Sequence, residues 1–484
     1  MPLPKLCVTV TGSTVAELRN RRDRVVDADL VELRLDTVSD PCAAAALAGR
    51  RRPVIVTCRP RWEGGQFAGS EEARRQILVD ALSLGAEFVD IEWRAGFDDV
   101  LQRTGGRRIV LSSHDFDGIP ADLAARVHAM RATGAEVVKV AVMAKRLSDN
   151  LALLPLAKSE VPTALIAMGD AGLVSRVLAG RLGSCWTYAG SAVAPGQVPA
   201  ERLHNEYGFR QIGPRTALYG VVGRPVTHSI SPALHNAAFR ANHLDAVYLP
   251  LAAATLDDFW TFADAFDVRG ASVTAPFKVE AFERADESDA VSRRIRALNT
   301  LKRDGRRWIG CNTDVAGFLR PLDGVTLHGT RATILGAGGA ARAVALALAS
   351  AGALVTVCAR RPGEAAAVAG LAGGTAGAWP VQPGTWDLLI NATPAGTFPD
   401  LDDTPVAPGA FTGRLVYDLV YNPAETRLLR DAAAAGLATL GGLEMLVAQA
   451  QQQFEWWTGV RSSGRVMRDA ALATLTTTAD GARS

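Results

Sequence analysis

The chain has 484 residues, too many for a single hydrophobic core, and this length suits two or three domains. Hydrophobic residues make up 48% and charged residues 21%, a balance typical of a globular enzyme and not of a disordered or fibrous chain. The formal net charge of +2 gives no electrostatic support for binding to nucleic acid or to a membrane surface. No uninterrupted apolar run reaches about 18 residues, so we expect no transmembrane helix.

The six cysteines are scattered along the chain without a Cys-x-x-Cys pair. We therefore expect neither a disulfide framework nor a zinc site, and we expect a reducing, cytoplasmic location. The first residues enter an apolar stretch without the basic-then-apolar order of a signal peptide, so we expect none. The seven histidines form no pair at ligand spacing, and we expect no bound metal.

Short apolar runs that end in polar residues recur along the first 200 positions. They cover residues 6–10, 30–35, 54–58, 88–93, 109–112, 137–142, 164–168 and 185–188. Segments with helical spacing, such as 70–84 and 120–133, lie between them. Short apolar strands that alternate with helices predict a parallel sheet that is buried on both faces. Eight such units favour a closed (β/α)8 barrel; a doubly wound sheet is the alternative, but no glycine-rich nucleotide turn follows any of these strands.

Polar side chains stand where a barrel keeps its active site, at the C-terminal ends of the strands. In chain order they are Glu32, Arg34, Arg59 with Glu63 in the following loop, Glu92, His114 and Lys139. A charged lysine is costly to bury inside a barrel, so we expect Lys139 to be held as a neutral amine, to have a partner, or both. A neutral amine beside a histidine suits Schiff-base formation with a ketone, followed by proton abstraction by the imidazole.

Each of these residues also has a structural interpretation when it is taken alone. Lys139 could be a salt-bridged barrel lysine, His114 a hydrogen-bonded core histidine, and Arg34 half of an ion pair with Glu32 or Asp36. Their joint position at the strand ends favours a catalytic site.

Six short motifs run in order through this half of the chain. They are Glu32-Leu33-Arg34-Leu35-Asp36, Thr57-Cys58-Arg59-Pro60 with Glu63-Gly64-Gly65, Ser113-His114-Asp115-Phe116, Val138-Lys139-Val140-Ala141, Met168-Gly169 with Ser175-Arg176, and Ala194-Pro195-Gly196-Gln197. With these motifs the first 200 residues resemble the type I 3-dehydroquinate dehydratases. The resemblance implies a TIM barrel over residues 1–210 that needs no cofactor.

The resemblance also implies roles for individual residues. Lys139 would form the imine with the substrate ketone, His114 would move the proton at the adjacent carbon, and Glu63 would orient His114. The residues that would bind the substrate's hydroxyls and carboxylate are Glu32, Arg34, Arg59, Arg176 and Gln197. The family often has a serine four positions before the glutamine, where this chain has Val193, so the hydrogen bond is absent or comes from Ser191.

A second α/β pattern begins after a short linker, residues 211–215, that contains a Gly-Pro pair. We predict strands at 217–222, 247–251 and 270–274, helices at 232–242 and 256–266, and a hairpin of residues 299–302 and 308–311. The hairpin turns at Asp304-Gly305, a dipeptide that suits positive φ angles.

A glycine-rich turn, residues 336–342, follows a short apolar strand at 332–335 and precedes an alanine-rich helix at 340–350. Glycines in this context allow backbone N–H groups to approach a pyrophosphate at a helix N-terminus, so the pattern predicts a dinucleotide site. The next strand, 354–358, ends in Arg360 and Arg361 where an NAD site would have an acidic residue. Arginines there would pair with a 2′-phosphate, which favours NADP; the alternative is that Arg360 is a solvated loop residue.

Seven motifs run through the back half. They are Ser229-Ile230-Ser231-Pro232, Ser272-Val273-Thr274-Ala275-Pro276-Phe277-Lys278, Leu298-Asn299-Thr300, Gly310-Cys311-Asn312-Thr313-Asp314, Asn391-Ala392-Thr393-Pro394-Ala395-Gly396, Tyr421-Asn422-Pro423 with Thr426, and Gly442-Leu443-Glu444-Met445-Leu446 with Gln449. Residues 217 to about 475 are thereby similar to the shikimate dehydrogenases. The family commonly has asparagine where this chain has Ser272, and we expect the change to be tolerated.

This second resemblance implies a substrate-binding domain over residues 216–315, completed by 439–475, and a Rossmann NADP-binding domain over 316–438. It implies that Lys278 and Asp314 are the catalytic pair, since an ammonium held by a carboxylate can supply the proton in a ketone reduction. The residues that would hold the substrate are Ser229, Ser231, Thr274, Asn299, Tyr421 and Gln449. Those that would hold the cofactor are Gly336, Ala337, Gly338, Gly339, Ala340, Arg360, Arg361, Asn391, Thr393 and Gly442.

The two resemblances together imply consecutive steps of the shikimate pathway of aromatic amino acid biosynthesis. The front half would dehydrate 3-dehydroquinate to 3-dehydroshikimate, and the back half would reduce this ketone to shikimate with NADPH. Two alternatives remain: a regulatory protein that senses a metabolite on the same folds, or a quinate dehydrogenase in the back half. All partners expected are small molecules, with no nucleic acid and no membrane; the motifs do not predict an oligomeric state.

Overall fold

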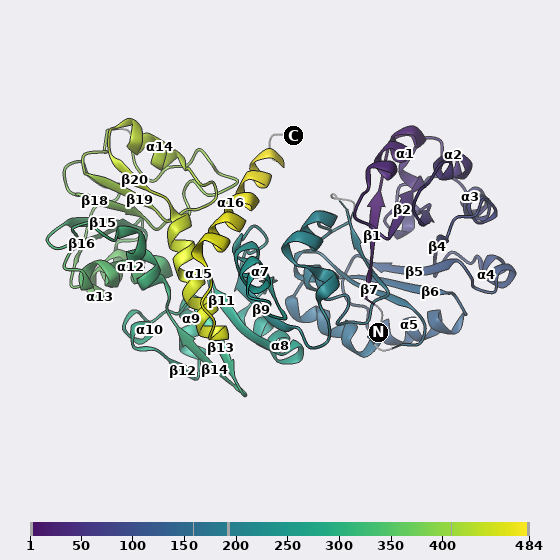
Figure 1. Ribbon diagram of the computed structural model, residues 1–484, viewed down its shortest axis with the longest axis horizontal. Helices are drawn as coiled ribbons and strands as arrows, with labels where there is room; N and C mark the ends of the chain where they lie inside the picture. Colours follow the sequence, from purple (N-terminus) through teal and green to yellow (C-terminus); the bar gives the residue numbers. More distant parts are fainter. Residues whose placement is uncertain (1–2, 158, 191–193, 408, 482–484) are drawn as a thin grey trace. The chain divides into compact units, whose positions relative to one another are not determined.

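The computed structural model describes residues 3–157, 159–190, 194–407 and 409–481, and these form two compact units along the chain (Figure 1). The first unit comprises Met1–Thr216 with Leu251–Asp267, and the second comprises Ala217–Pro250 with Val268–Ser484. Both units combine strands with surrounding helices, as the alternating sequence pattern predicts.

The first unit is built on a sheet of parallel strands. In the described part of this unit they are β1 (Lys5–Val10), β2 (Leu30–Arg34), β3 (Val54–Thr57), β4 (Phe88–Glu92), β5 (Ile109–Asp115), β6 (Val137–Met143), β7 (Thr163–Met168) and β8 (Trp186–Ala189). Neighbours follow the order β7-β6-β5-β4-β3-β2-β1-β8. The backbone N–H of Cys185 donates to the Thr163 carbonyl at 3.0 Å, which brings the two end strands together. The predicted barrel is confirmed as a nearly closed eight-stranded α/β barrel.

Helices follow the strands and cover the barrel from outside. They are α1 (Val15–Arg24), α2 (Ala43–Leu47), α3 (Glu71–Ser83), α4 (Asp98–Thr104), α5 (Leu123–Ala132), η3 (Leu147–Leu156) and α6 (Leu173–Val177). Helix α3 illustrates how these helices begin and how they pack against the barrel. Its N-cap Ser70 accepts a hydrogen bond from the Ala73 N–H, and its buried Leu78 and Ala81 provide an apolar face for the barrel.

Residues 251–267 belong to the first unit although they follow a strand of the second unit along the chain. Their helix α8 (Leu256–Phe266) packs against η3. The buried Asp258 carboxylate accepts hydrogen bonds from the backbone N–H groups of Leu147 at 2.9 Å and Ser148 at 2.8 Å. The helix therefore satisfies the N-terminal donors of η3.

The second unit contains two sheets. Within the described ranges, the first has the order β10-β9-β11-β13-β14-β12 and the second the order β17-β16-β15-β18-β19-β20. The first sheet consists of β9 (Ala217–Gly223), β10 (Ala246–Ala252), β11 (Val268–Val273), β12 (Glu287–Ser288), β13 (Thr300–Asp304) and β14 (Arg307–Cys311). Strands β13 and β14 form the predicted hairpin, but Asp304 pairs with Arg307, so its turn residues are Gly305-Arg306. Its helices are α7 (Ser231–Ala241), α9 (Lys278–Arg284), α10 (Ala290–Ile295) and α11 (Asp314–Leu319).

The second sheet is a doubly wound, parallel Rossmann sheet, as predicted. It consists of β15 (Arg331–Leu335), β16 (Leu354–Cys358), β17 (Thr375–Ala376), β18 (Leu388–Asn391), β19 (Leu415–Asp418) and β20 (Ala438–Leu440), with helices α12 (Gly339–Ser350), α13 (Pro362–Leu371) and α14 (Arg427–Ala434). The strand order reverses between β15 and β18, the usual place for a ligand in such sheets.

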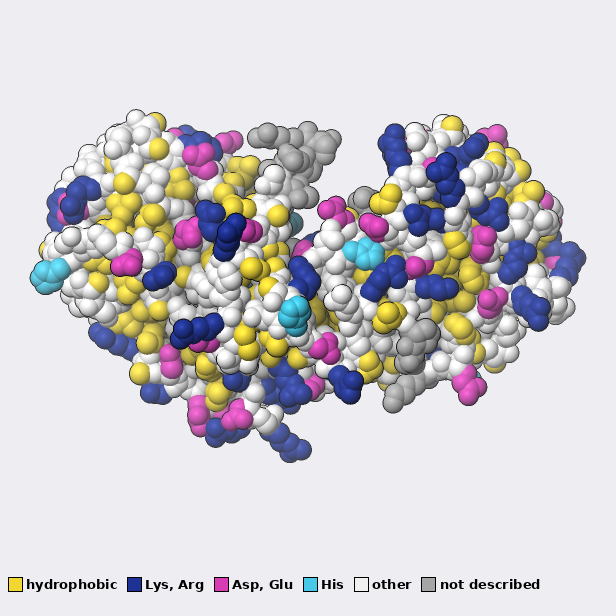
Figure 2. All heavy atoms as spheres, in the orientation of Figure 1, with side chains coloured by type: hydrophobic (Ala, Val, Ile, Leu, Met, Phe, Trp, Pro, Cys, Tyr) yellow, Lys and Arg dark blue, Asp and Glu magenta, His cyan; other side chains and the backbone are white. Residues whose placement is uncertain are grey.

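Two long helices end the chain, α15 (Gly442–Thr458) and α16 (Gly464–Gly481). Helix α15 returns to the first sheet of this unit, where Trp457 donates to the Leu301 carbonyl at 2.9 Å, and α16 packs against α7 (Figure 1). Basic and acidic side chains are interspersed on the visible face of each unit (Figure 2). None of the helices in the described ranges is both long and apolar enough to cross a membrane.

Candidate active sites

The Lys139 ammonium lies inside the barrel among carboxylates. It is 3.4 Å from Glu32 and 3.2 Å from Asp90, and it stands 4.4 Å above the centre of the Tyr188 ring. All of these side chains are buried, and Lys139 itself is only 5% exposed. Burial raises the pKa of Glu32, but the charges of Lys139 and Arg34 outweigh it and hold this pKa below its ordinary value. The partner that the sequence predicts for a buried lysine is therefore a pair of carboxylates.

Arg59, two residues after strand β3, shares the Asp90 carboxylate with Lys139. Its guanidinium is 3.0 Å from Asp90 and 2.7 Å from Glu92, and it donates to the Ser112 hydroxyl at 2.9 Å. Burial disfavours the charged form of Arg59, yet the charges of Asp90 and Glu92 raise its pKa above the ordinary value. Gly65 is required next to it, because a Cβ at this position would lie 2.1 Å from the Arg59 carbonyl oxygen.

His114 is tied to Glu63, as the sequence predicts for an orienting carboxylate. The Glu63 carboxylate accepts from the His114 backbone N–H at 2.7 Å and lies 3.4 Å from Nδ1 of the ring. Burial, and then the charge of Arg59, lower the pKa of His114 to about 4, so its imidazole is neutral at pH 7. A neutral imidazole can accept a proton, which is what a general base needs.

Three other predicted residues of this half differ in their hydrogen-bond and ion-pair partners. Arg34 forms a bidentate pair with Asp36, with both distances 2.8 Å, so its ion-pair partner is Asp36. Gln197 donates to the Thr9 hydroxyl at 3.4 Å. Arg176 is 2% exposed and, among the described residues, donates only to backbone carbonyls; its Nε has no partner, and burial lowers its pKa to about 10.

Burying a guanidinium without an anionic partner costs free energy, so a bound anion would stabilise Arg176. Val193 stands where the family often has serine, and Ser191 is the residue that could supply the missing hydrogen bond. Both lie outside the described residues.

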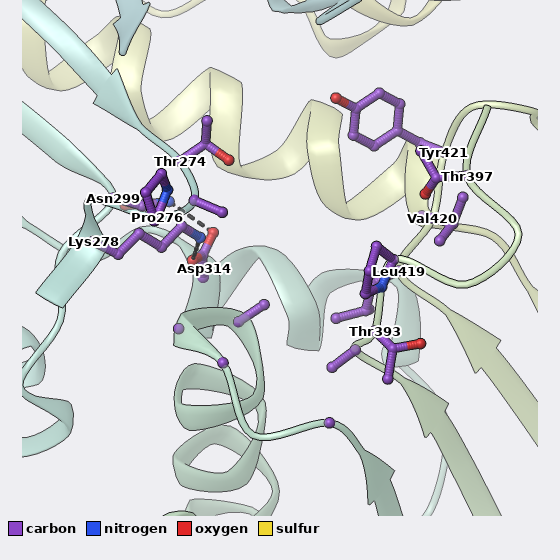
Figure 3. A pocket seen from close by; sticks show the side chains of 18 of the residues that line it. Thr274, Pro276, Lys278, Asn299, Asp314, Thr393, Thr397, Leu419, Val420 and Tyr421 are labelled. Carbon is purple, nitrogen blue, oxygen red and sulfur yellow. Dashed lines mark hydrogen bonds and ion pairs between the residues drawn. The ribbon is translucent and has the colours of Figure 1, made fainter. Parts of the chain in front are cut away.

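The second cluster lines a cleft of about 1430 Å³ in the second unit. Lys278 begins helix α9 and Asp314 begins α11, and their side chains form an ion pair at 2.5 Å. Asn299 donates to the other oxygen of Asp314 at 2.7 Å. Figure 3 shows these three side chains together on one side of the cleft, with Tyr421 and Thr393 on the other. The ion pair is thus fixed in orientation and faces open space.

The remaining predicted substrate ligands of this half line the same cleft. They are Ser229, Ser231, Thr274, Tyr421 and Gln449. Gln449 on helix α15 accepts from Asn299 at 2.9 Å, which draws the last long helix to the catalytic pair. Burial raises the pKa of Tyr421, and its hydrogen bond with Ser229 opposes this shift. Hydroxyl and amide groups that converge on a cleft suit a polyhydroxylated ligand.

The other wall of the cleft has the geometry of a dinucleotide site. Gly336 has a φ of +110°, which only glycine adopts readily, and a Cβ at Gly339 would lie 3.0 Å from the Lys278 side chain. Ala337, Gly338 and Ala340 line the same wall, and Gly338 precedes the N-terminus of the 12-residue helix α12. These features fit a pyrophosphate held by backbone N–H groups.

Two arginines follow strand β16 on this wall. Arg361 pairs with Glu364 at 2.9 Å, whereas Arg360 is exposed and lines the cleft. The structure places Thr393 and Gly442 on the cleft as well, and Asn391 behind Thr393, to whose backbone N–H its side chain is hydrogen-bonded at 3.0 Å. An arginine at the end of the second Rossmann strand fits a 2′-phosphate.

Comparisons with known proteins agree with this geometry. The family Type I 3-dehydroquinase matches residues 6–214, the Shikimate dehydrogenase substrate binding domain matches 221–301, and the Shikimate 5′-dehydrogenase C-terminal domain matches 442–472. The chloroplastic bifunctional 3-dehydroquinate dehydratase/shikimate dehydrogenase of Arabidopsis thaliana is 34% identical over 495 residues, which cover 94% of this chain and 82% of the relative. The chain belongs to this bifunctional family.

Other relatives match the back half alone. Shikimate dehydrogenase (NADP(+)) of Moorella thermoacetica is 42% identical over 54% of this chain and 95% of its own length. A crystal structure of shikimate dehydrogenase in complex with NADP⁺ has a TM-score of 0.51 and 34% identity, and covers 55% of this chain and 97% of the solved one.

Sequence reasoning overlooked Asp90 and Asp418 of this bifunctional enzyme and gave Ser272 no role. Asp90 lies two residues before Glu92 on β4, and the period of two would have placed it on the same inward face. Ser272, at the position where asparagine is common, accepts from Tyr248 and donates to Gln453, both at 2.7 Å. Asp418 on β19 accepts from Asn391, the Val420 backbone N–H and Thr426, and so joins two loops of the cleft.

Proposed function

We propose that the two clusters perform two consecutive steps: dehydration of 3-dehydroquinate to 3-dehydroshikimate, and reduction of that ketone to shikimate with NADPH. One observation supports both steps: each half gathers a lysine, its carboxylate partner and further polar side chains into one site. The proposed domains are the barrel over 1–210, the substrate domain over 216–315 with 439–475, and the NADP domain over 316–438.

In the dehydratase half, the Lys139 amine attacks the substrate ketone and water leaves, which gives an imine. The attack uses the unprotonated amine of Lys139. The neutral His114 imidazole then takes a proton from the carbon next to the imine, and the imine accepts the electron pair. His114 returns the proton to the leaving hydroxyl, and hydrolysis of the imine releases the product.

The charges around Lys139 support this role. Asp90 and Glu32 hold the amine in place, Glu63 steadies the imidazolium that forms on His114, and the unpaired Arg176 would receive the substrate carboxylate. Arg34, Arg59 and Gln197 would complete the binding of hydroxyls and carboxylate.

In the dehydrogenase half, Lys278 holds a proton at Nζ, next to Asp314, and would donate it to the ketone oxygen as this oxygen gains charge. Ser229, Ser231, Thr274, Asn299, Tyr421 and Gln449 would hold the hydroxyls and carboxylate. Bound NADPH supplies the hydride. The glycine turn, Thr393 and Gly442 would contact NADPH directly, and Arg360 with Arg361 would bind its 2′-phosphate. Asn391, which was expected to bind the cofactor, is completely buried and would instead orient Thr393 from behind.

The two alternatives are less well supported. A sensor without catalysis would not need Lys139, His114, Lys278 and Asp314, and all four are present. A quinate dehydrogenase that uses NAD would not need Arg360 at the cleft. We also propose a reducing compartment such as the cytoplasm, because the six cysteines are free.

Two assays test the halves separately. Borohydride added with 3-dehydroquinate should fix a covalent adduct on the protein, and Lys139→Ala should abolish it. NADPH should be oxidised with 3-dehydroshikimate, and Lys278→Ala should suppress this. If the wild-type chain forms no adduct, the assignment of the front half is refuted. If it oxidises no NADPH, the assignment of the back half is refuted.

A further inference from the structure

We infer that Arg74, on a helix outside the barrel, is a positioning residue of the dehydratase site that acts on Arg59 through Glu92. The inference rests on the proposed dehydratase function. It adds a residue that none of the sequence motifs contains.

Arg74 projects from α3 into the wall of the barrel and is completely buried. One end of its guanidinium forms an ion pair with Glu92. The other end donates to the Glu71 carboxylate from Nε at 2.9 Å and Nη2 at 2.6 Å, while the Phe97 ring lies 4.7 Å away. The guanidinium is thus held on both edges and on one face, so it cannot rotate without breaking charged contacts.

Glu92 divides its two oxygens between two arginines. Oε1 binds Arg59 at 2.7 Å and Oε2 binds Arg74. Arg59 in turn binds Asp90 at 3.0 Å, and Asp90 binds Lys139 at 3.2 Å. A line of alternating charges therefore runs from helix α3 to the amine that would form the imine.

Among the buried charges of this line, Arg74 balances Glu92, whereas its other partner, Glu71, is exposed to solvent. Three buried carboxylates, Glu32, Asp90 and Glu92, face Lys139 and Arg59, and Arg74 is the third cation. Without it, one Glu92 oxygen would be buried and unpaired. Arg59 would then be drawn toward Glu92 and away from Asp90, which would leave the Asp90 charge to Lys139 alone.

The groups that act on Lys139 come from most of the barrel. They are Cys7 on β1, Glu32 on β2, Asp90 on β4, His114 on β5 and Tyr188 on β8, with Arg59 after β3 linked to Lys139 through Asp90. Of these, only Arg59 is coupled to Arg74 through a shared carboxylate. Loss of Arg74 should therefore weaken the hold of Arg59 on Asp90 and leave more negative charge beside the Lys139 amine, which attacks a ketone only without its proton.

The test is the pH profile of the dehydratase reaction in the full chain with Arg74→Gln. We expect kcat at pH 7 to fall about tenfold and the acid limb of the profile to move up by about one pH unit, with KM changed less than kcat. Arg74→Lys keeps the charge and should retain the wild-type limb. Dehydrogenase activity of the same chain should not change.

Arg75 is the matched control on the same helix. It pairs with Asp99 on the outer surface, away from Glu92, so Arg75→Gln should leave the profile unchanged. The double variant R74Q/E92Q removes one charge of each sign and should return the limb toward its wild-type position. If Arg74→Gln alone does not fold, this double variant still tests the inference.

A wild-type acid limb in Arg74→Gln would overturn the inference, even if the variant unfolds at a lower temperature, because Arg74 would then have a structural role alone. A double variant whose limb stays displaced would overturn it too. Failure of the proposed function is distinct, since the wild-type chain would then show no dehydration of 3-dehydroquinate at all.

Discussion

The two candidate sites of this chain place a reactive lysine in opposite environments. In the barrel, Lys139 is 5% exposed and lies beside the buried carboxylates of Glu32 and Asp90. In the second unit, Lys278 has Asp314 as its one carboxylate partner among the described residues and faces a cleft of about 1430 Å³. A lysine that itself forms a covalent bond needs a dry and balanced charge environment, whereas a lysine that only donates a proton needs room for substrate and cofactor beside it.

This difference also explains where each site obtains its rigidity. The barrel site is fixed by ion pairs between adjacent strands, such as Arg59 with Asp90. The cleft is fixed by neutral hydrogen bonds that converge from several elements, such as Asn299 with Gln449. Removal of a charge should therefore affect the barrel site more than removal of a hydrogen bond affects the cleft.

The largest effect should come from Lys139→Ala. Because Lys139 is the one buried lysine among the described residues of the barrel, dehydratase turnover should fall by about 10⁴-fold or more, and borohydride should no longer fix an adduct. Dehydrogenase turnover measured with 3-dehydroshikimate should be unchanged. Residual dehydration within tenfold of wild type would remove Lys139 from the mechanism.

Lys278→Ala should have the next largest effect, on the other reaction. Loss of the proton donor should lower dehydrogenase kcat by about 10²- to 10⁴-fold, and Asp314→Asn should lower it less because the amine is kept. The measurement is NADPH oxidation at saturating 3-dehydroshikimate, with dehydratase turnover as the internal control. An unchanged kcat would assign the proton to another group.

Arg360→Gln should change the cofactor preference. Since a charge-assisted contact to the 2′-phosphate would be lost, KM for NADPH should rise about 10- to 100-fold while KM for NADH stays the same. Arg361→Gln is the matched comparison; Arg361 already pairs with Glu364, so its effect should be smaller. Equal effects of Arg360→Gln on both cofactors would contradict 2′-phosphate recognition.

Asp418→Asn should have a modest effect on the cleft. The carboxylate accepts from Val420 at 3.0 Å and from Thr426 at 2.6 Å, and an amide can accept at only one of its two positions. We expect the Kd for NADPH to rise about three- to tenfold, measured by fluorescence, with no change in dehydration. A Kd equal to wild type would show that these loops are held by other contacts.

The smallest effect at neutral pH concerns His114. Because burial and Arg59 lower its pKa to about 4, the imidazole stays neutral until the pH falls through about 4, and the rate loss due to its protonation should occur there. Titration of the ring by NMR in the free enzyme should give this value, with His114→Asn to assign the signal. A midpoint near 6.5 would show that the ring is not desolvated.

The fold was predictable because its signals are local. Strand β6 was expected at 137–142 and spans Val137–Met143, and helix α8 was expected and found at Leu256–Phe266. Alternating apolar runs and a glycine turn suffice for such elements. Short strands such as β12 (Glu287–Ser288) and β17 (Thr375–Ala376) were not predicted, since two residues have no periodicity and form only by pairing with a neighbour.

The site residues divide in the same way. Lys139, His114, Lys278 and Asp314 lie in recognisable motifs. His114 is near the end of β5, and Lys278 and Asp314 begin helices, whereas Lys139 is the third residue of β6 and so lies further inside the barrel than the expected strand end. Arg74 and Asp418 were not predicted because their importance comes from partners far along the chain, such as Glu92 for Arg74. Contacts of this kind depend on tertiary packing, which spacing in one sequence does not reveal.

The most direct test of two consecutive reactions is to supply the intact chain with 3-dehydroquinate and NADPH and to follow shikimate. We expect one NADPH to be oxidised for each 3-dehydroquinate consumed, with shikimate as the product. Lys139→Ala should stop the sequence before any NADPH is used, and Lys278→Ala should stop it at 3-dehydroshikimate. Absence of shikimate with the wild-type chain, or NADPH oxidation from 3-dehydroquinate by the Lys139→Ala chain, would contradict the proposed division of labour.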